Sequence, residues 1–187
     1  VLQWIGAPFQ AQVVNGDQRK TPEFLALNPA GSVPVLEDNG WVLTQNSAIL
    51  NYLADLHPEA KLSGDGTPKD RANVNRWLSF LNADVHPAFH PLFGSTAYLG
   101  EDSAGKTKEA ARKKLRGFFE VLDQQLKGQK WLTGTRSIAD PYLFVVTQWA
   151  KKMGIDLTGL DHLTAFDQRM AADAGVQAAM KAEGLPG

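Results

Sequence analysis

Hydrophobic and polar positions follow different spacings in the two halves of the chain. Before residue 58, short apolar runs alternate with turns, and residues 9–14 partly alternate apolar and polar side chains, which predicts a strand. Residues 33–37 and 41–43 flank Asn39-Gly40, a dipeptide that favours the tight turn of a hairpin. This half is therefore predicted to be a small domain of strands and short helices.

Helical spacing of apolar residues dominates the second half. The chain divides at residues 57–70, where a polar stretch from Glu59 to Lys69, rich in Gly, Pro and Ser, is predicted to be a linker. The stretch 137–153 is apolar around most of its circumference, which predicts a buried central helix, and Ser137 and Asp140 form a capping pattern at its start. Helices are predicted, in chain order, over 21–26, 49–56, 71–93, 106–126, 137–153, 160–172 and 176–182.

These patterns divide the chain into an α/β domain over 1–58 and an all-α domain over 69–187. The first five residues are apolar at helical spacing and are followed by Gly6 and Pro8, a helix stop. We predict that they are the last turns of a helix that begins before Val1; a frayed terminal segment is the alternative.

Composition excludes several classes of function. The 187 residues carry 19 Lys and Arg against 20 Asp and Glu, a formal charge of −1, so nothing favours nucleic acid or an anionic membrane as a partner. No apolar run approaches the roughly 20 residues that cross a bilayer. Cysteine is absent from the sequence, which excludes disulfides and thiolate metal ligands in these residues and fits a reducing, cytoplasmic location.

Two stretches of the first domain are candidates for ligand binding. Val33 precedes Pro34, which cannot donate to a sheet and is therefore expected at an edge, where the Val33 main chain could pair with an extended peptide. A trans proline that merely starts a strand is favoured on sequence alone. Gln45 and Asn46 open a predicted helix whose first amides favour a carboxylate; ordinary capping by Asn46 or Ser47 is the alternative.

His86 is the candidate for chemistry in the second domain. A histidine at the end of a long helix could hydrogen-bond to a thiolate or a substrate, and a structural histidine is the alternative. His90 lies four residues later, but Pro87 disturbs the helix between them and no His-Glu-x-x-His motif is present. We therefore predict no metal site.

Several stretches together resemble the glutathione S-transferase family, most closely its bacterial beta class. They keep the family's order along nearly the whole chain and lie at 27–36, 43–53, 77–78, 85–86, 91–93, 131–134, 137–140 and 182–185. The resemblance implies a thioredoxin-like N-terminal domain, incomplete here, an all-helical C-terminal domain, a homodimer, and glutathione as co-substrate. It also implies that the family's first strand, and the Cys, Ser or Tyr after it, precede Val1.

The resemblance assigns roles to residues of the first domain. Val33 would pair through its main chain with the cysteinyl part of glutathione, beside a cis Pro34. Gln45 and Asn46 would hold the γ-glutamyl group, although the family more often has Glu or Gln followed by Ser or Gly.

Three residues of the second domain receive roles in the same way. His86 would face the thiol, and Asp84 would reach the ligand bound to the partner subunit. Ser79 falls where the class usually has Asn, which weakens that contact.

The function that the resemblance implies is conjugation of glutathione to small hydrophobic electrophiles, as in bacterial detoxification. The electrophile is expected against apolar side chains such as Phe89 or Phe93. The alternatives are a glutathione-dependent thiol–disulfide oxidoreductase, a non-catalytic glutathione-binding stress protein, and a structural interaction module without glutathione.

Overall fold

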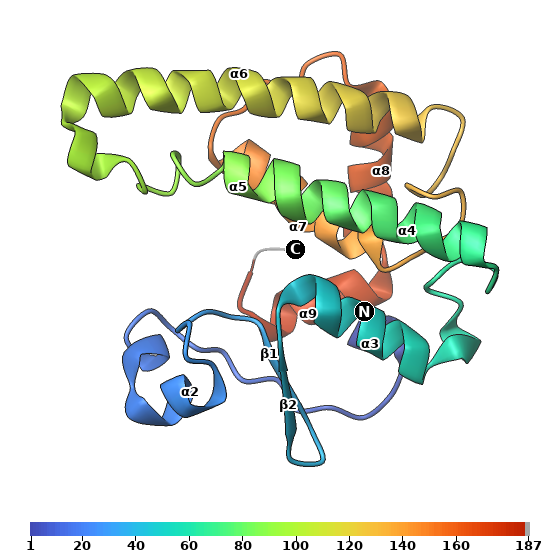
Figure 1. Ribbon diagram of the computed structural model, residues 1–187. Helices are drawn as coiled ribbons and strands as arrows, with labels where there is room; N and C mark the ends of the chain where they lie inside the picture. Colours follow the sequence, from blue (N-terminus) through green and yellow to red (C-terminus); the bar gives the residue numbers. More distant parts are fainter. Residues whose placement is uncertain (186–187) are drawn as a thin grey trace. The chain divides into compact units, whose positions relative to one another are not determined.

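The computed structural model describes residues 1–185 and divides into two compact units (Figure 1). The N-terminal unit comprises Val1–Ala60 and the segment from Ala174 onward, and the helical unit comprises Lys61–Asp173. The elements in chain order are α1 (Leu2–Ile5), η1 (Gln18–Lys20), α2 (Pro22–Leu27), β1 (Val35–Asp38), β2 (Trp41–Thr44), α3 (Asn46–Leu56), η2 (Pro58–Ala60), α4 (Pro68–Phe80), η3 (Leu81–Val85), α5 (His86–Ala88), η4 (Ala97–Leu99), α6 (Glu101–Leu126), α7 (Ala139–Lys152), α8 (Asp161–Ala171) and α9 (Ala174–Ala182).

The predicted hairpin is present in the N-terminal unit. Strands β1 and β2 are antiparallel, with Val35 opposite Thr44 at the open end and Asp38 opposite Trp41 beside the turn. Asn39 and Gly40 both have positive φ, 51° and 82°, as a turn of type I′ requires. The local sequence therefore determines both the position and the register of this sheet.

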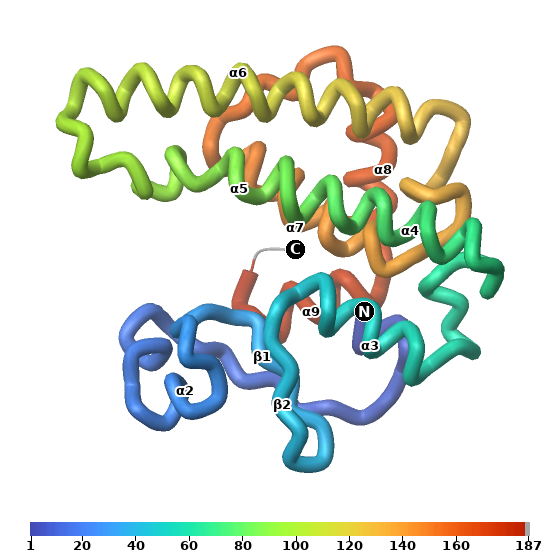
Figure 2. The backbone as a smooth tube through the Cα atoms, viewed as in Figure 1, coloured from blue at the N-terminus to red at the C-terminus, as the bar shows by residue number. Residues whose placement is uncertain are grey.

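The predicted strand over 9–14 is wrong. The structure assigns no strand there, and among the described residues no backbone hydrogen bond uses this segment, which Figure 2 shows as a long irregular trace. A strand exists only where a neighbour completes its ladder, and the only sheet of the described residues is the β1–β2 pair. The alternation of apolar and polar side chains indicates a preference for a strand, but it does not identify a neighbouring strand with which the segment could pair.

Local signals correctly predicted several helices of the N-terminal unit. The Thr21 hydroxyl accepts a hydrogen bond from the Phe24 amide at 3.3 Å, so it caps α2, and Gly6 ends α1 with φ of 76°. Helix α9 contacts α1 and groups with this unit. This differs from the predicted range 69–187, which placed α9 with the other helices.

Helix α7 has the most buried side chains in its unit, as the apolar stretch predicted. At its start the Ser137 amide donates to Asp140 Oδ2 at 2.7 Å, and the Ser137 hydroxyl accepts from the Ala139 amide at 3.3 Å. Asp140 Oδ1 also accepts from the Leu132 amide at 2.9 Å, so the carboxylate joins the preceding loop to the helix. No helix within residues 1–185 is both long enough and apolar enough to cross a membrane.

The single helix predicted over 71–93 is divided into three parts. Helix α4 ends at Phe80, the π-helix η3 follows, and α5 covers only His86–Ala88. Pro87 has no N–H group with which to continue the ladder of an α-helix, and short π segments commonly occur within helices at functional sites. The interruption lies immediately before His86.

The predicted linker is anchored at one residue. Leu62 is only 1% exposed, and its carbonyl accepts a hydrogen bond from the Ile138 amide at 2.9 Å, beside the start of α7. The polar composition of the stretch predicted a linker, and the structure places Leu62 in the core of the helical unit.

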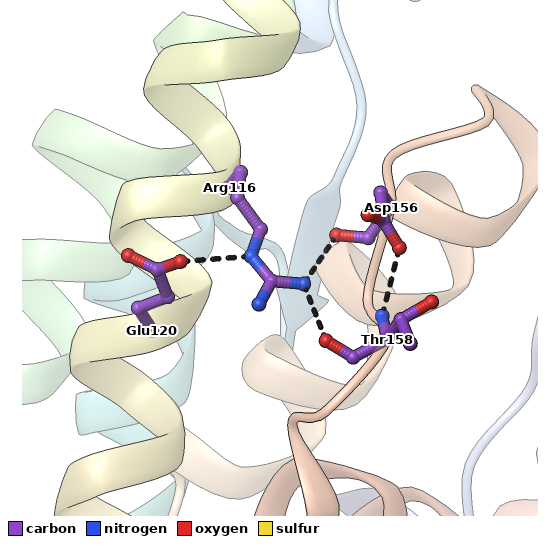
Figure 3. A network of polar contacts seen from close by, with 4 residues as sticks. All are labelled: Arg116, Glu120, Asp156 and Thr158. Carbon is purple, nitrogen blue, oxygen red and sulfur yellow. Dashed lines mark hydrogen bonds and ion pairs between the residues drawn. The ribbon is translucent and has the colours of Figure 1, made fainter.

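Arg116 joins α6 to the loop that precedes α8 (Figure 3). Its Nη1 donates to the carbonyls of Asp156 and Thr158, each at 2.9 Å, while Nε pairs with Glu120 at 2.9 Å. The guanidinium satisfies two loop carbonyls that have no secondary-structure partner, so its role is structural.

Candidate functional site

The candidate residues of the N-terminal unit lie together at the open end of the hairpin. Because Val35 pairs with Thr44, the residues before β1 and after β2 meet at the same end of the sheet. The Val33–Pro34 bond is cis, so the trans alternative is wrong and the expectation from the resemblance is met. Val33 is 50% exposed, and no hydrogen bond found within residues 1–185 uses its amide or carbonyl.

Gln45 occupies the N-cap position of α3 in an unusual backbone conformation. Its φ and ψ are 72° and 112°, outside the regions that residues other than glycine normally adopt. Its side chain is exposed and makes no capping hydrogen bond, and Asn46 and Ser47 lie within the first turn and do not cap it. The alternative of ordinary capping is therefore wrong, and the first amides of α3 have no side-chain acceptor among the described residues.

His86 is half-buried in the helical unit and is held by a tyrosine. His86 Nδ1 lies 2.7 Å from the Tyr142 hydroxyl, which donates to Asn82 Oδ1 at 3.3 Å. Burial, with a smaller contribution from nearby His90, lowers the pKa of His86, so the ring is neutral at neutral pH. No hydrogen bond among residues 1–185 uses its Nε2, which leaves this nitrogen available to a ligand.

Aromatic rings surround His86. The ring of Trp149 lies 4.8 Å from it, centroid to centroid, and contacts Phe93 edge to face at 5.3 Å. Phe93 is 46% exposed, whereas Phe89 is completely buried, so only Phe93 of the two expected residues can contact an electrophile. Within the described part of the chain, no group of three or more metal-ligating side chains is present.

The remaining candidates are exposed residues of the same long segment. Ser79 lies in α4 and Asp84 in η3, and both face solvent. The structure thus places Val33, Pro34, Gln45 and Asn46 in the N-terminal unit, and Ser79, Asp84 and His86 in the helical unit.

Sequence reasoning missed Tyr142 and Asn82. Tyr142 is separated from His86 by 56 positions, so no local pattern joins them. A signal was available, because a tyrosine inside a buried helix needs a partner for its hydroxyl, and Tyr142 is the tyrosine within the predicted central helix.

Comparison with known proteins identifies the family. Residues 1–56 match the glutathione S-transferase N-terminal domain, and residues 81–174 match the glutathione S-transferase C-terminal domain. The glutathione S-transferase GST-4.5 of Xanthomonas campestris is 55% identical over 187 residues, which cover 99% of this chain and 92% of the relative.

Solved structures agree with this family. A glutathione S-transferase from Xylella fastidiosa is 52% identical with a TM-score of 0.97, and the match covers 99% of this chain and 91% of that chain. A sphingomonad glutathione S-transferase complexed with glutathione (37%, TM-score 0.86) and a beta-class enzyme of Sphingomonas chungbukensis (39%, TM-score 0.86) each match over 99% of this chain and 92% of theirs.

The chain therefore belongs to the glutathione S-transferase family, and its structural neighbours include bacterial beta-class members. It is an enzyme that conjugates glutathione, as its relatives' names indicate.

Proposed function

We propose that Val33, Gln45 and Asn46 bind glutathione and that His86 accepts the thiol proton, so that the sulfur attacks a small hydrophobic electrophile. Each role is supported within its own unit: the Val33 main chain is unused in the N-terminal unit, and the Nε2 atom of His86 is unused in the helical unit. The related sphingomonad enzyme, which was solved with glutathione bound, supports glutathione as the ligand.

The end of the hairpin suits a short extended peptide. The amide and carbonyl of Val33 can form one rung of a ladder with the cysteinyl residue of glutathione, since they have no partner among the described residues. The cis bond to Pro34 stands where the strand begins. Pairing with the Val33 main chain would fix the cysteinyl main chain and so direct its side chain.

The start of α3 suits the γ-glutamyl group. This group carries a carboxylate and an ammonium at its free end, and uncapped helix amides favour the carboxylate. The exposed Gln45 amide can donate to the carboxylate and accept from the ammonium, and Asn46 can do the same from the next position. Gln45 and Asn46 thus recognise both charges of the group.

His86 supplies the acid–base chemistry. A free thiol with a pKa of about 8.5 is mostly protonated at pH 7, so an acceptor near the sulfur raises the fraction of the reactive thiolate. In the proposed step the S–H bond breaks and the proton bonds to Nε2 of His86. The sulfur electron pair forms a bond to the electrophilic carbon, and the bond from that carbon to its leaving group breaks, so that a nitroaryl chloride releases chloride. The neutral ring of His86 is in the correct state to accept that proton.

Two further roles concern the partner subunit and the electrophile. We infer a homodimer in which the exposed Asp84 carboxylate and Ser79 hydroxyl contact glutathione bound to the partner. Exposed Phe93, beside Trp149, offers an apolar surface to an aromatic or otherwise hydrophobic electrophile. A chain without cysteine is compatible with the reducing cytoplasm, where removal of electrophiles would serve detoxification.

Two variants test the binding and chemical roles separately. Gln45→Ala should raise the Kd of glutathione about tenfold, the value expected for loss of a hydrogen bond to a charged group, with little change in kcat. His86→Ala should lower kcat roughly 100-fold, within the range of general acid–base assistance, with little change in Kd. Titration calorimetry measures Kd, and turnover of a nitroaryl chloride measures kcat.

Matched controls are available in each unit. Gln10→Ala removes an exposed amide from the loop before η1, and His162→Ala removes a histidine from α8; neither should change Kd or kcat. An unchanged Kd in Gln45→Ala would remove this residue from the site, and an unchanged kcat in His86→Ala would leave His86 as a structural histidine.

A further inference from the structure

The hydroxyl of Tyr142 links two residues of the segment that contains His86. It lies 2.7 Å from His86 Nδ1 and 3.3 Å from Asn82 Oδ1, while the tyrosine side chain is only 5% exposed. Tyr142 belongs to α7, the central helix that the Ser137 and Asp140 cap fixes at its start. The hydroxyl is therefore a fixed point against which the histidine ring is held.

Asn82 and His86 are four residues apart, a spacing that places two side chains on the same face of a helical segment, and both reach the same hydroxyl. Asn82 lies in η3, His86 is the first residue after η3, and η3 packs against α7. The contact of both residues with Tyr142 thus joins this segment to α7 immediately before and at His86.

The hydrogen bonds determine which nitrogen of His86 carries the proton. A hydroxyl has one proton, and the amide oxygen of Asn82 can only accept, so Tyr142 donates to Asn82. The oxygen of Tyr142 then offers a lone pair to His86 Nδ1, and a hydrogen bond there requires that Nδ1 donate. Burial raises the pKa of Tyr142 to about 12, so the hydroxyl keeps its proton throughout the neutral range.

We infer that Tyr142, itself oriented by Asn82, is a positioning residue that holds neutral His86 as the Nδ1–H tautomer and leaves Nε2 as the proton acceptor. The inference rests on the proposed role of His86 toward the glutathione thiol. A residue that bonds to one ring nitrogen sets the chemistry of the other. Tyr142 and Asn82 thereby act on the reaction through His86.

The ring tautomer can be measured directly. Two-dimensional ¹H–¹⁵N spectra of the full chain distinguish protonated from unprotonated ring nitrogens, and His86→Ala identifies the signals of His86 among the four histidines. The wild-type protein should show Nδ1 protonated and Nε2 unprotonated. Tyr142→Phe should shift the proton to Nε2, the tautomer that predominates in free histidine.

Asn82→Ala is the second variant and leaves the tyrosine in place. Without the amide oxygen, the Tyr142 hydroxyl is released to donate to Nδ1, so this variant should also shift the proton to Nε2. Asn82 is exposed, so the substitution does not disturb the core. Tyr98→Phe removes a hydroxyl from an exposed tyrosine and should leave the His86 tautomer unchanged.

Kinetics provide the second readout. Tyr142→Phe and Asn82→Ala should each lower kcat at least about tenfold, part of the roughly 10²–10⁴-fold that acid–base assistance contributes, while the Kd of glutathione changes less than about twofold. In Tyr142→Phe the acid limb of the kcat profile should move to lower pH, because imidazolium loses its acceptor and the pKa of His86 falls. The titratable groups that face His86 are His90 and Tyr142.

The outcomes separate this inference from the proposed function. Protonated Nε2 in the wild-type protein, or an unchanged tautomer in both variants, would overturn the inference. If Tyr142→Phe and Asn82→Ala change the tautomer but leave kcat unchanged, while His86→Ala lowers kcat, the inference would also be overturned. If His86→Ala leaves kcat unchanged, the proposed function of His86 is refuted, and the tautomer still decides whether Tyr142 orients the ring.

Discussion

Helices α3 and α7 begin in opposite ways. At α7 the start is buried: the Asp140 carboxylate accepts from the amides of Ser137 and Leu132, at 2.7 and 2.9 Å. At α3 the N-cap residue is Gln45, whose exposed side chain caps nothing. The start of α7 has side-chain acceptors from the protein itself, and the start of α3 has no side-chain cap.

The types of residue present do not explain this difference. Both helix starts contain residues that commonly cap helices, Ser137 in one and Asn46 with Ser47 in the other. At α7 a carboxylate stands three residues after the serine, whereas the residue three positions after Gln45 is Ala48. The uncapped start of α3 therefore differs from the capped start of α7 in the position of its polar side chains, not in their number.

Burial adds a second difference. Desolvation raises the pKa of Asp140 to about 6, although hydrogen bonds from the Leu132 and Ser137 amides oppose the rise. The Asp140 carboxylate is buried even though burial disfavours its charged form, so it is not accessible to a ligand. The α7 cap therefore serves folding.

The largest expected effect comes from removing the Asp140 carboxylate at the start of α7. Asp140→Ala leaves the buried amides of Leu132 and Ser137 without acceptors, so it should lower the free energy of unfolding by about 3 kcal/mol. For a chain of this size that corresponds to a fall in Tm of about 10 °C, measured by thermal melting of the helical circular dichroism.

Asp161→Ala is the control for this prediction. Asp161 lies in the first turn of α8 and is exposed, so its removal should cost at most about 0.5 kcal/mol through the helix dipole. A similar Tm for Asp140→Ala and Asp161→Ala would contradict the structural role of the α7 cap.

The same contrast explains which features could be predicted from sequence. The hairpin and α7 depend on local signals, Asn39-Gly40 and the Ser137 and Asp140 pair, and both were predicted correctly. The strand over 9–14 was not, because a strand requires a partner that the local sequence does not specify.

The candidate site likewise contains residues that local sequence features identify and residues that only packing brings together. Val33 and Gln45 could be chosen from their neighbours in sequence and from the family resemblance, since a proline and a helix start are local features. The contact of Tyr142 with His86 joins two helices across 56 positions, and the π-helix before His86 interrupts the regular spacing that sequence reasoning uses. Both depend on packing.

The next effect concerns the open start of α3. Gln45→Gly should stabilise the protein by about 1 kcal/mol, because relief of roughly 1–3 kcal/mol of backbone strain at φ 72° exceeds the roughly 0.5–1 kcal/mol that glycine's freedom costs. The same variant should weaken glutathione binding about tenfold, as Gln45→Ala does. Urea denaturation and titration calorimetry measure the two effects.

Gln45→Ala separates the backbone from the amide in this comparison. Alanine removes the amide but keeps the strained φ, so it should lose affinity without gaining stability. Equal stability of the glycine and alanine variants would show that the backbone conformation of Gln45 stores no strain. The lack of a cap at the start of α3 would then not be connected with backbone strain.

The smallest expected effect is at the neighbouring residue. Asn46 lies in the first turn of α3 and caps nothing, so Asn46→Ala should change the free energy of unfolding by less than about 0.5 kcal/mol, with a slight gain from helix propensity. Thr21→Ala, which removes the cap of α2 from the same unit, should cost about 1 kcal/mol in the same urea titration. If both variants lost the same stability, Asn46 would be acting as a cap, and the distinction between a capped and an uncapped helix start would fail at α3.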